Sequence, residues 1–380
     1  MPDSRQRNVT RRGFLIKAGQ GLVVTRALGA LAPSASAQPV PDPPGKKAGW
    51  AIVGLGSLAI NQILPAFAKC EKSRVVALVS GHPEKAKKLA ARYGVDPKRI
   101  YDYQSYDSIK DNPEVDVIYI VLPNGMHAEY TVRGHQAGKH VLSEKPMANT
   151  PADCQAMIEA ARKANRKLMV AYRCRYEPFN QEMIRMAREQ ELGPVKVILA
   201  DHGFSIGDPT QWRLKKALAG GGSMMDIGIY SLQAARYVTG EEPVEINAMS
   251  YTTPGDERFK EVEEATNFQL RFPSGVLANC SSSYGYSGQN RYRVVTTKGW
   301  FELEPATGYS GLRMRVRRRG DAIEERTLPV RDHFALEMDH MSECVMDGKD
   351  PLTPGEEGLR DMRLIMAVYE AAQSGKTVKV

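Results

Sequence analysis

The 380-residue chain has few cysteines and no long hydrophobic run, and both shortages exclude classes of protein. Its five cysteines are widely scattered, with neither the paired spacing of a zinc site nor the density of a disulfide framework. The apolar stretch near the start, residues 19–31, is interrupted by Arg26 and is too short to span a bilayer. We therefore expect no bound metal, no disulfide scaffold and no membrane partner for the mature chain.

A large excess of positive charge is also missing once the start of the chain is set aside. The whole sequence carries a formal net charge of +8, with 52 basic and 44 acidic residues. Residues 1–37 hold six of these basic residues and one of the acidic ones, so the rest of the chain is close to +3. Arg313, Arg315 and Arg317 alternate with Met314 and Val316, which is typical of a strand with one solvated face. The charge thus gives no support to a nucleic-acid partner.

The first 37 residues have the parts of a twin-arginine export signal. Arg11 and Arg12 precede the apolar stretch, and Ala35-Ser36-Ala37 supplies the small residues expected before a cleavage site. Signals of this type export proteins that are already folded, often with a cofactor inserted. We expect a periplasmic protein, with a Pro-rich extended arm over residues 38–48 ahead of the first domain.

Residues 49–172 predict a dinucleotide-binding domain. A short apolar strand, residues 50–53, leads directly into a glycine-rich turn and a predicted helix over residues 58–69. In such a turn the first glycine permits the bend, the second lets a pyrophosphate approach the backbone, and a small residue lets the helix pack on the strand. The residues of this predicted cofactor turn are Gly54, Gly56, Ser57, Leu58 and Ala59.

The next predicted strand, residues 74–79, carries the evidence on which dinucleotide is bound. It ends at Ser80, where an NAD-binding protein would have an acidic residue, and Lys85 lies on the helix that follows. A carboxylate would repel the 2′-phosphate of NADP, whereas a hydroxyl and a nearby ammonium would accept it. Ser80 and Lys85 therefore predict NADP as the cofactor.

Two further predicted strands, residues 115–122 and 140–143, end in polar clusters. These clusters are Pro123-Asn124 and Glu144-Lys145-Pro146. Because the carboxyl ends of parallel strands form the ligand crevice of an open sheet, both clusters should flank the nicotinamide. Helices over 127–137 and 151–165 and a strand over 167–172 complete the predicted domain.

Residues 173–380 predict a second domain with a largely antiparallel open sheet. Strand-like runs follow one another without intervening helices, at residues 195–202, 245–251, 265–272 and 276–283, and Pro273-Ser274-Gly275 predicts a hairpin turn. Helices over 333–346 and 356–374 should pack back on the first domain. The fold class is thus α/β, an N-terminal Rossmann domain followed by an α+β domain, and the exposed sheet face is expected to make the protein a homo-oligomer.

A helix of the second domain carries a candidate acid–base pair. It follows Gly220-Gly221-Gly222 and spans residues 223–237, with Asp226 and Tyr230 four positions apart on one face. With Lys145 across the crevice, these side chains predict a proton-handling group, because an ammonium stabilises a phenolate. Tyr230 would then remove a hydroxyl proton while hydride leaves the same carbon for the nicotinamide.

Taken together, the glycine-rich turn, the Glu144-Lys145-Pro146 triplet and the block from Gly220 to Tyr230 resemble the Gfo/Idh/MocA oxidoreductase family. Longer segments resemble its glucose-fructose oxidoreductase branch, and they lie at residues 63–65, 79–81, 101–103, 172–174, 211–213 and 305–309. The resemblance implies tightly bound NADP and oxidation of a cyclic aldose at C1 to the lactone. It also implies transfer of the hydride to a second sugar, fructose or another aldose, which becomes an alditol.

The same resemblance implies roles for individual residues. Lys145, Asp226 and Tyr230 are implied as catalytic, with Asp226 orienting the sugar, and Arg173 and Tyr309 are implied to border the substrate. Beyond the glycine-rich turn, the implied cofactor-binding residues are Ser80, Lys85, Leu122, Asn124, His127, Glu144, Lys145, Arg173, Trp212 and Arg213.

Two alternatives to the self-recycling enzyme are open at this level. The first is an ordinary NADP-dependent aldose dehydrogenase with an exchangeable cofactor. The second is a non-catalytic dinucleotide-binding sensor, since a Rossmann domain by itself does not determine function. The set of Lys145, Asp226 and Tyr230 argues against the sensor.

Overall fold

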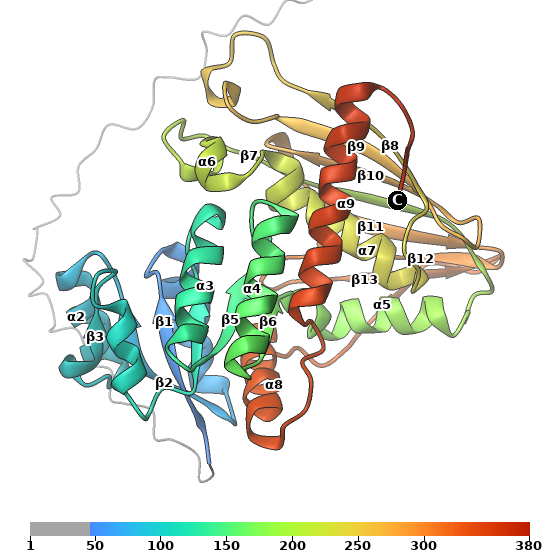
Figure 1. Ribbon diagram of the computed structural model, residues 1–380. Helices are drawn as coiled ribbons and strands as arrows, with labels where there is room; N and C mark the ends of the chain where they lie inside the picture. Colours follow the sequence, from blue (N-terminus) through green and yellow to red (C-terminus); the bar gives the residue numbers. More distant parts are fainter. Residues whose placement is uncertain (1–45) are drawn as a thin grey trace, which may run out of the picture. The chain divides into compact units, whose positions relative to one another are not determined.

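Residues 46–380 are described by the structure, which is a computed structural model. The predicted export signal and most of the predicted arm lie outside the described residues. Within them the strands form two sheets, one of six strands and one of nine (Figure 1).

The six-stranded sheet is parallel throughout, with the strand order β3-β2-β1-β4-β5-β6. Its strands are β1 (Ala48–Val53), β2 (Ser73–Val79), β3 (Ile100–Tyr101), β4 (Val117–Ile120), β5 (His140–Glu144) and β6 (Leu168–Ala171). The helices α2 (Pro83–Tyr93), α3 (His127–Gln136) and α4 (Pro151–Ala164) connect them. Every residue of β1 and β4 is buried, as expected for central parallel strands covered on both faces, and the edge strand β6 is buried too because α4 and α9 pack against it. The predicted Rossmann architecture is confirmed.

The helix after the glycine-rich turn is less regular than the sequence predicts. Its first part, Ala59–Ile63, has the wide π pitch, α1 (Leu64–Ala66) is a single α turn, and Phe67–Lys69 tightens to a 3₁₀ turn. Pro65 explains the change of pitch, because it has no N–H to donate and its ring would clash with the carbonyl four residues earlier. The helix widens just before the proline and so continues past it.

The nine-stranded sheet has the order β14-β13-β12-β11-β7-β10-β9-β8-β15 and is antiparallel except between β7 and β10. Its strands are β7 (Val195–Ser205), β8 (Glu245–Tyr251), β9 (Ala265–Arg271), β10 (Leu277–Ser283), β11 (Gly285–Thr296), β12 (Gly299–Leu303), β13 (Met314–Arg318), β14 (Glu324–Arg326) and β15 (Val378–Lys379). The predicted hairpin turn joins β9 to β10, with the Phe272 N–H donating to Val276 O at 3.0 Å. The predicted sheet type is confirmed.

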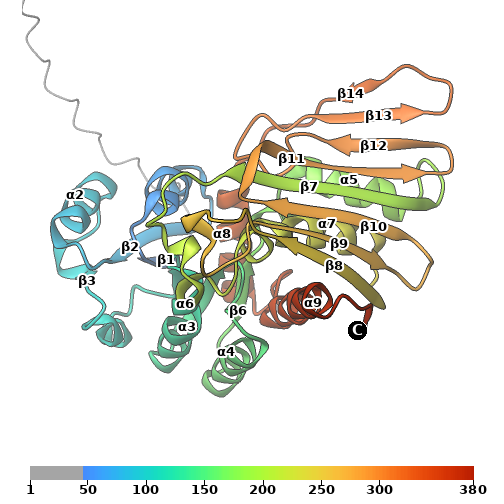
Figure 2. The same cartoon turned by 90° about the horizontal axis from the view of Figure 1, so that it is seen from above.

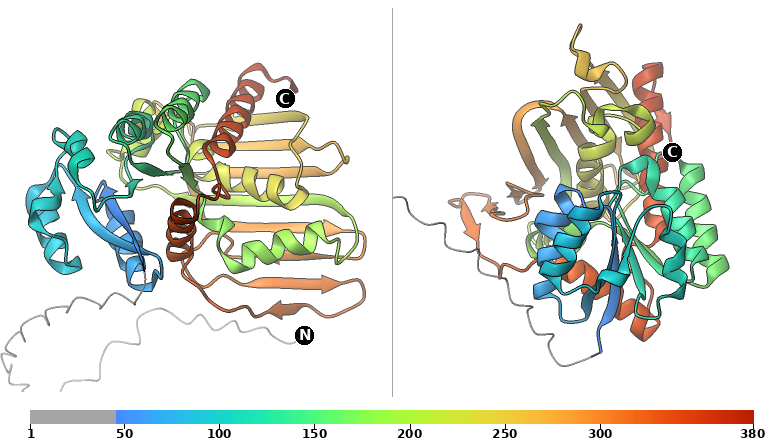
Figure 3. Two further views of the ribbon diagram at one scale, coloured as in Figure 1. Left: turned by 60° about the horizontal axis from the view of Figure 1, so that its bottom comes forward. Right: turned by 90° about the vertical axis from the view of Figure 1, so that its left-hand side faces the viewer.

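Helices cover one face of the nine-stranded sheet and leave the other free of helices (Figure 2). The covering helices are α5 (Pro178–Arg188), α7 (Ile229–Thr239) and α9 (Gly355–Ser374). Figure 3 shows α5 and α7 running along this face. Because side chains alternate along a strand, apolar residues of the other face are left exposed, among them Leu199, Met249, Tyr251 and Leu277. Self-association through this face stays a prediction.

Two late helices join the second part of the chain to the first. Helix α8 (His333–Asp347) packs against β1 and β2, and the Trp50 indole N–H donates to Ser342 Oγ at 3.0 Å. Helix α9 contacts α4 and β6 on one side and β8 on the other. The predicted return of these helices to the first domain is therefore seen for both, although α9 belongs equally to the second sheet.

The basic run of the second domain lies on β13, where its neighbours explain it. Arg315 pairs with Glu302 and Glu304, while Met314 and Val316 between the arginines are buried.

Residues 46–380 contain no helix with the length and hydropathy to cross a membrane, and no group of three or more His, Cys, Asp or Glu side chains that could hold a metal ion. All five cysteines are free thiols.

Arg236 ties α7 to α9, and its loss should destabilise the fold. The guanidinium is buried and pairs with Asp361 and Glu357 of α9 and with Glu242. Because Arg236→Met leaves Asp361 buried without its partner, we expect the free energy of unfolding to fall by about 3–5 kcal/mol in denaturant titration. The matched control is Arg360→Ala, whose half-exposed pair with Glu357 should contribute no more than about 1 kcal/mol. Equal losses in the two variants would contradict the assignment.

Candidate active site

A cleft of about 1080 Å³ lies where the carboxyl ends of the parallel strands meet the second domain. The first domain contributes the glycine-rich turn and the residues that follow β2, β4 and β5. The second contributes β7, β11 and the segment 304–309. Ligands of open α/β sheets bind at this kind of crevice, as the strand ends predicted.

The cleft brings together nearly all of the residues that the sequence nominated. Those that line it are Gly54, Gly56, Ser57, Leu58, Ser80, Lys85, Leu122, Asn124, Glu144, Lys145, Arg173, Trp212, Arg213, Asp226, Tyr230 and Tyr309. Two nominated residues do not line it. Ala59 is fully buried in the core beneath the helix, and His127 is fully buried with its ring nitrogens bonded to Leu122 O and Pro146 O at 2.8 and 2.9 Å. His127 thus supports the cleft wall from behind.

The glycine-rich turn has the shape of a cradle for a phosphate group. Gly54 has a φ of +93°, and a Cβ there would lie 2.3 Å from Val121 O. At Gly56 an added Cβ would meet no atom within 4 Å, so it would project into free space. Lys85 reaches across the turn to donate to Leu55 O at 3.3 Å. A helix that starts behind such a turn presents free N–H groups, which fits a pyrophosphate.

Lys145 and Asp226 form an ion pair between the two domains. The ammonium donates to the Asp226 carboxylate at 3.1 Å and to its main-chain oxygen at 2.6 Å. The other carboxylate oxygen accepts from Arg213 Nε at 2.9 Å and from the Tyr284 hydroxyl at 3.0 Å. Both oxygens of Asp226 are therefore occupied by donors, which fixes the position of Lys145.

Asp226 remains ionised and Lys145 remains protonated near neutral pH. Burial acts to raise the pKa of Asp226, but Lys145 and Arg213 outweigh it and hold that pKa well below its ordinary value. Burial acts to lower the pKa of Lys145, yet Tyr230, Asp226 and Glu144 outweigh it, and the pKa is raised. Asp226 is thus a fixed anion that orients the site, and it is not a proton acceptor at neutral pH.

The three glycines before Asp226 bring its helix against the sheet. A Cβ on Gly221 would lie 2.1 Å from the Tyr369 hydroxyl, and one on Gly222 would lie 1.9 Å from Glu263 O. The helix then opens with a wide π turn over Met224–Gly228 before it continues as α7. The predicted helix over residues 223–237 is confirmed, and its first turn has the wider π pitch. Such wide turns occur frequently at functional sites.

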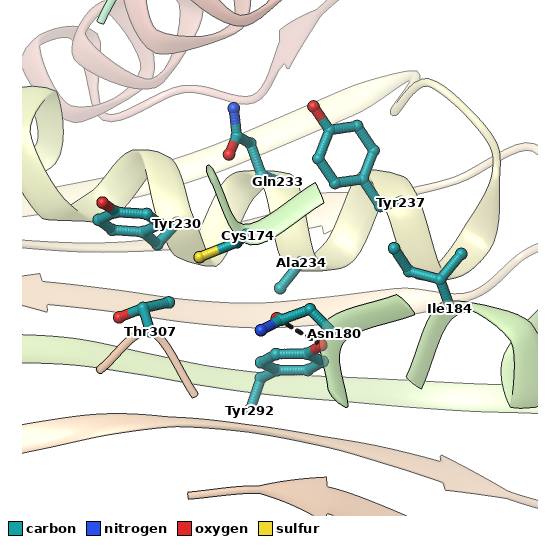
Figure 4. Close-up of a pocket in the computed structure, with 9 residues that line it drawn as sticks. All are labelled: Cys174, Asn180, Ile184, Tyr230, Gln233, Ala234, Tyr237, Tyr292 and Thr307. Atoms are coloured by element: carbon teal, nitrogen blue, oxygen red, sulfur yellow. Dashed lines mark hydrogen bonds between the residues drawn. The ribbon is translucent and has the colours of Figure 1, made fainter. Parts of the chain in front are cut away.

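Tyr230 lies between two cations. Lys145 Nζ is 4.8 Å from the centre of its ring, and Arg173 Nη2 donates to its hydroxyl oxygen at 3.3 Å. Behind the ring is a small cavity of about 20 Å³, lined among others by Cys174 and Tyr237 (Figure 4). A cavity of this size holds a single water molecule at most.

Three residues of the site were not nominated from the sequence: His202, Tyr284 and His333. His202 Nδ1 lies 2.8 Å from the Ser231 hydroxyl, which itself donates to main-chain carbonyls, so the imidazole carries its proton on Nδ1. Burial, together with the nearby Arg173, lowers the pKa of His202 to about 3. His202 lines the cleft, whereas Tyr284 and His333 reach the site through Asp226 and Arg173. No sequence motif marks these residues, because tertiary packing alone brings them to the site.

Family models match most of the described chain. Residues 48–172 match "Oxidoreductase family, NAD-binding Rossmann fold", and residues 180–302 match "GFO/IDH/MocA C-terminal domain". The chain therefore belongs to the Gfo/Idh/MocA oxidoreductase family, as its motifs predicted, and it is a sugar oxidoreductase of that family.

Named relatives narrow the comparison. A solved structure described as aldose-aldose oxidoreductase from Caulobacter crescentus, complexed with glycerol, is 52% identical, with a TM-score of 0.86 over 88% of this chain and all of that one. D-xylose 1-dehydrogenase [NADP(+)] of Haloarcula marismortui is 30% identical over 87% of this chain and 92% of its own length. A 3-ketoreductase from Actinomadura kijaniata, solved with NADP and TDP-benzene, is 24% identical with a TM-score of 0.77 and shows the same fold. These names agree with the predicted cofactor.

Gly56 provides a direct test of the cradle. Since a Cβ there meets no protein atom, Gly56→Ala should fold normally but place a methyl group where a pyrophosphate would lie. We expect the affinity for NADP to fall at least about tenfold, or ~1.4 kcal/mol, in calorimetric titration of protein stripped of nucleotide. Gly207→Ala, also in open space, should leave the affinity unchanged. An unaltered affinity in Gly56→Ala would place the cofactor elsewhere.

Removal of the Asp226 charge should shift the pH dependence of sugar oxidation. Asp226 helps to raise the pKa of Lys145, so in Asp226→Asn the ammonium should lose its proton at a lower pH. We expect the alkaline limb of the pH–rate profile to move to lower pH and the rate at neutral pH to fall. Asp201→Asn, which breaks a partly exposed pair with Arg291, is the control and should leave the profile in place. A shift in the opposite direction would contradict the assigned pairing.

Proposed function

We propose that the protein is an NADP-containing oxidoreductase that oxidises a cyclic aldose at C1 to the lactone and reduces a second aldose to the alditol. One observation carries this proposal: Lys145, Asp226 and Tyr230 converge in the same cleft that the glycine-rich cradle lines. The identity of 52% to a protein described as an aldose-aldose oxidoreductase supports the choice of an aldose as acceptor.

The residues around the cradle fit NADP. The turn leaves room for a pyrophosphate at Gly56, and Ser80 and Lys85 lie at the strand end where the adenosine ribose is expected. The hydroxyl of Ser80 and the ammonium of Lys85 suit a 2′-phosphate. Bound NADP would supply a nicotinamide ring that accepts hydride from one sugar and returns it to another.

Tyr230 and Lys145 handle the proton that leaves the sugar hydroxyl. Tyr230 takes the proton of the C1 hydroxyl as the C1–H bond is broken, so that the carbon is left as the carbonyl of a lactone. Lys145 faces the tyrosine ring and carries a positive charge that stabilises the phenolate form. When a second aldose enters in its open-chain form, the same proton goes from Tyr230 to its carbonyl oxygen, and an alditol results. The proton and the hydride removed from the first sugar are therefore both delivered to the second sugar.

A second candidate is an ordinary NADP-dependent aldose dehydrogenase. The 30% identity to a D-xylose 1-dehydrogenase [NADP(+)] favours it. The two candidates share the chemistry of the first half-reaction and differ in whether the reduced cofactor leaves. The predicted twin-arginine signal in residues 1–37 favours a retained cofactor, because free NADP is not supplied outside the cytoplasm. On that basis we also propose a periplasmic location. The exposed apolar side chains of the open sheet face support a further proposal, that the protein associates with itself through this face.

Purified protein without added NADP separates these candidates. We expect glucose alone to give both gluconolactone and sorbitol in equal amounts, measured by chromatography. Lactone that appears only when fructose is supplied would indicate a ketose acceptor, and turnover only with added NADP would indicate the dehydrogenase.

Tyr230→Phe should lower the rate by about 10²–10⁴ while NADP remains bound. Tyr251→Phe, on the exposed sheet face, is the control and should be fully active. An active Tyr230→Phe enzyme would contradict the proposed proton transfer.

A further inference from the structure

Arg173 makes a contact that cofactor binding and substrate binding do not explain. It begins the turn that follows β6, and it is 8% exposed. One of its terminal nitrogens, Nη2, lies 3.3 Å from the hydroxyl oxygen of Tyr230 and donates to it. Lys145 lies over the face of the same ring, so the tyrosine has one cation at its ring and another at its oxygen.

The direction of this hydrogen bond determines what Tyr230 can do. A guanidinium only donates, so the hydroxyl oxygen of Tyr230 must accept. The proton of the phenol then has to point away from Arg173. A donor on the oxygen also favours the state in which that oxygen has lost its proton. The contact therefore favours Tyr230 as the group that receives a proton from the substrate.

The remaining contacts of Arg173 hold the guanidinium in place without neutralising it. Nη2 donates to Thr307 O at 2.6 Å, and Nη1 donates to Gly308 O at 3.5 Å and to His333 Nε2 at 3.3 Å. These partners are two main-chain carbonyls and an imidazole, and none of them is an anion. A buried cation is stable only when it is paired and hydrogen-bonded, and a phenolate at Tyr230 would supply the negative charge.

Lys145 differs from Arg173, because its positive charge is already paired with a carboxylate. It pairs with Asp226, which also pairs with Arg213. The other groups that face Tyr230 are His202 from β7, which is neutral because its pKa is lowered to about 3, and Tyr309 from the segment after β12. The carboxyl groups of Glu144 and Glu337 also lie within electrostatic reach of Arg173, but its hydrogen bonds go elsewhere, so Tyr230 is the acidic group that Arg173 contacts directly.

His333 positions Arg173. Because Nε2 accepts from the guanidinium, the imidazole must be neutral, and burial beside Arg173 lowers the pKa of His333 to about 3. The residue lies at the first turn of α8, the helix that packs on the first domain. The phenol is thus linked through Arg173 to a helix fixed against β1 and β2.

We propose that Arg173 is a catalytic residue that stabilises the Tyr230 phenolate by a direct hydrogen bond, and that His333 is the residue that positions it. The phenolate takes the proton of the sugar C1 hydroxyl, the O–H bond breaks as the new phenol O–H forms, and Arg173 remains hydrogen-bonded to the same oxygen. This inference rests on the proposed function, since it gives Tyr230 the role of proton acceptor.

The first test does not depend on turnover. Holoenzyme is titrated with base while the ultraviolet absorbance of tyrosinate is recorded, and the matching Tyr230→Phe variant is subtracted to isolate Tyr230. We expect Arg173→Met to move the tyrosinate signal of Tyr230 to higher pH, because the variant loses the hydrogen bond that favours the oxygen without its proton. Arg173→Lys, which keeps the charge, should restore much of the shift. An unmoved titration in Arg173→Met would overturn the proposal.

The second test uses the reaction. Lactone formation by Arg173→Met should show a kcat lowered at least about tenfold near neutral pH, with its pH–rate profile moved to higher pH and KM for the sugar little changed. Loss of NADP or a raised KM, with the profile in place, would make Arg173 a binding residue and overturn the proposal.

His333 provides a second pair of variants. His333→Gln keeps an acceptor for Arg173 and should resemble the wild type, whereas His333→Phe removes the acceptor and should move the profile in the same direction as Arg173→Met. Identical profiles for the two His333 variants would refute the positioning role. If wild-type protein formed no lactone at all, the proposed function would fail, while the tyrosinate titration would still decide on Arg173.

Discussion

The ion pair of Lys145 with Asp226 is the contact on which the rest of the site depends. It joins the end of a parallel strand to a helix of the second domain, and it uses both the carboxylate and a main-chain oxygen of Asp226. A buried ammonium beside a buried carboxylate is stable only when the remaining hydrogen-bonding capacity is used, and Arg213 and Tyr284 use it. The pair thus fixes the place at which Tyr230 meets the first domain.

Much of this arrangement can be predicted from the sequence because strand ends are easy to locate. Apolar runs end at Ser80, Asn124 and Glu144, and the carboxyl ends of parallel strands share one edge of a sheet. The glycine block before Asp226 is equally visible, although its reason is steric: Gly221 and Gly222 lie where any side chain would meet Tyr369 or Glu263. At these positions the residue that the local sequence pattern marks is also the residue that tertiary packing requires.

The parts that sequence reasoning missed depend on packing over long distances. The long strand β11 has no apolar alternation in its first half, and β3 has only two residues. The wide pitch at Met224–Gly228 follows no propensity rule, although the helix itself was predicted. His202 reaches the cleft on β7, which pairs in parallel with β10, and His333 reaches Arg173 because α8 folds back across the first sheet. None of these relations is encoded within a window of neighbouring residues.

The placement of α9 has a mechanical consequence. This helix is in contact with α4 and β6 of the first domain and with β8 of the second, and buried charges join it to α7. Rotation of one domain against the other would have to break these contacts, so the joint resists hinge opening. Ligands that enter or leave the cleft would then pass segments that line it, such as residues 211–213 and 304–309, without a large change in the angle between the domains.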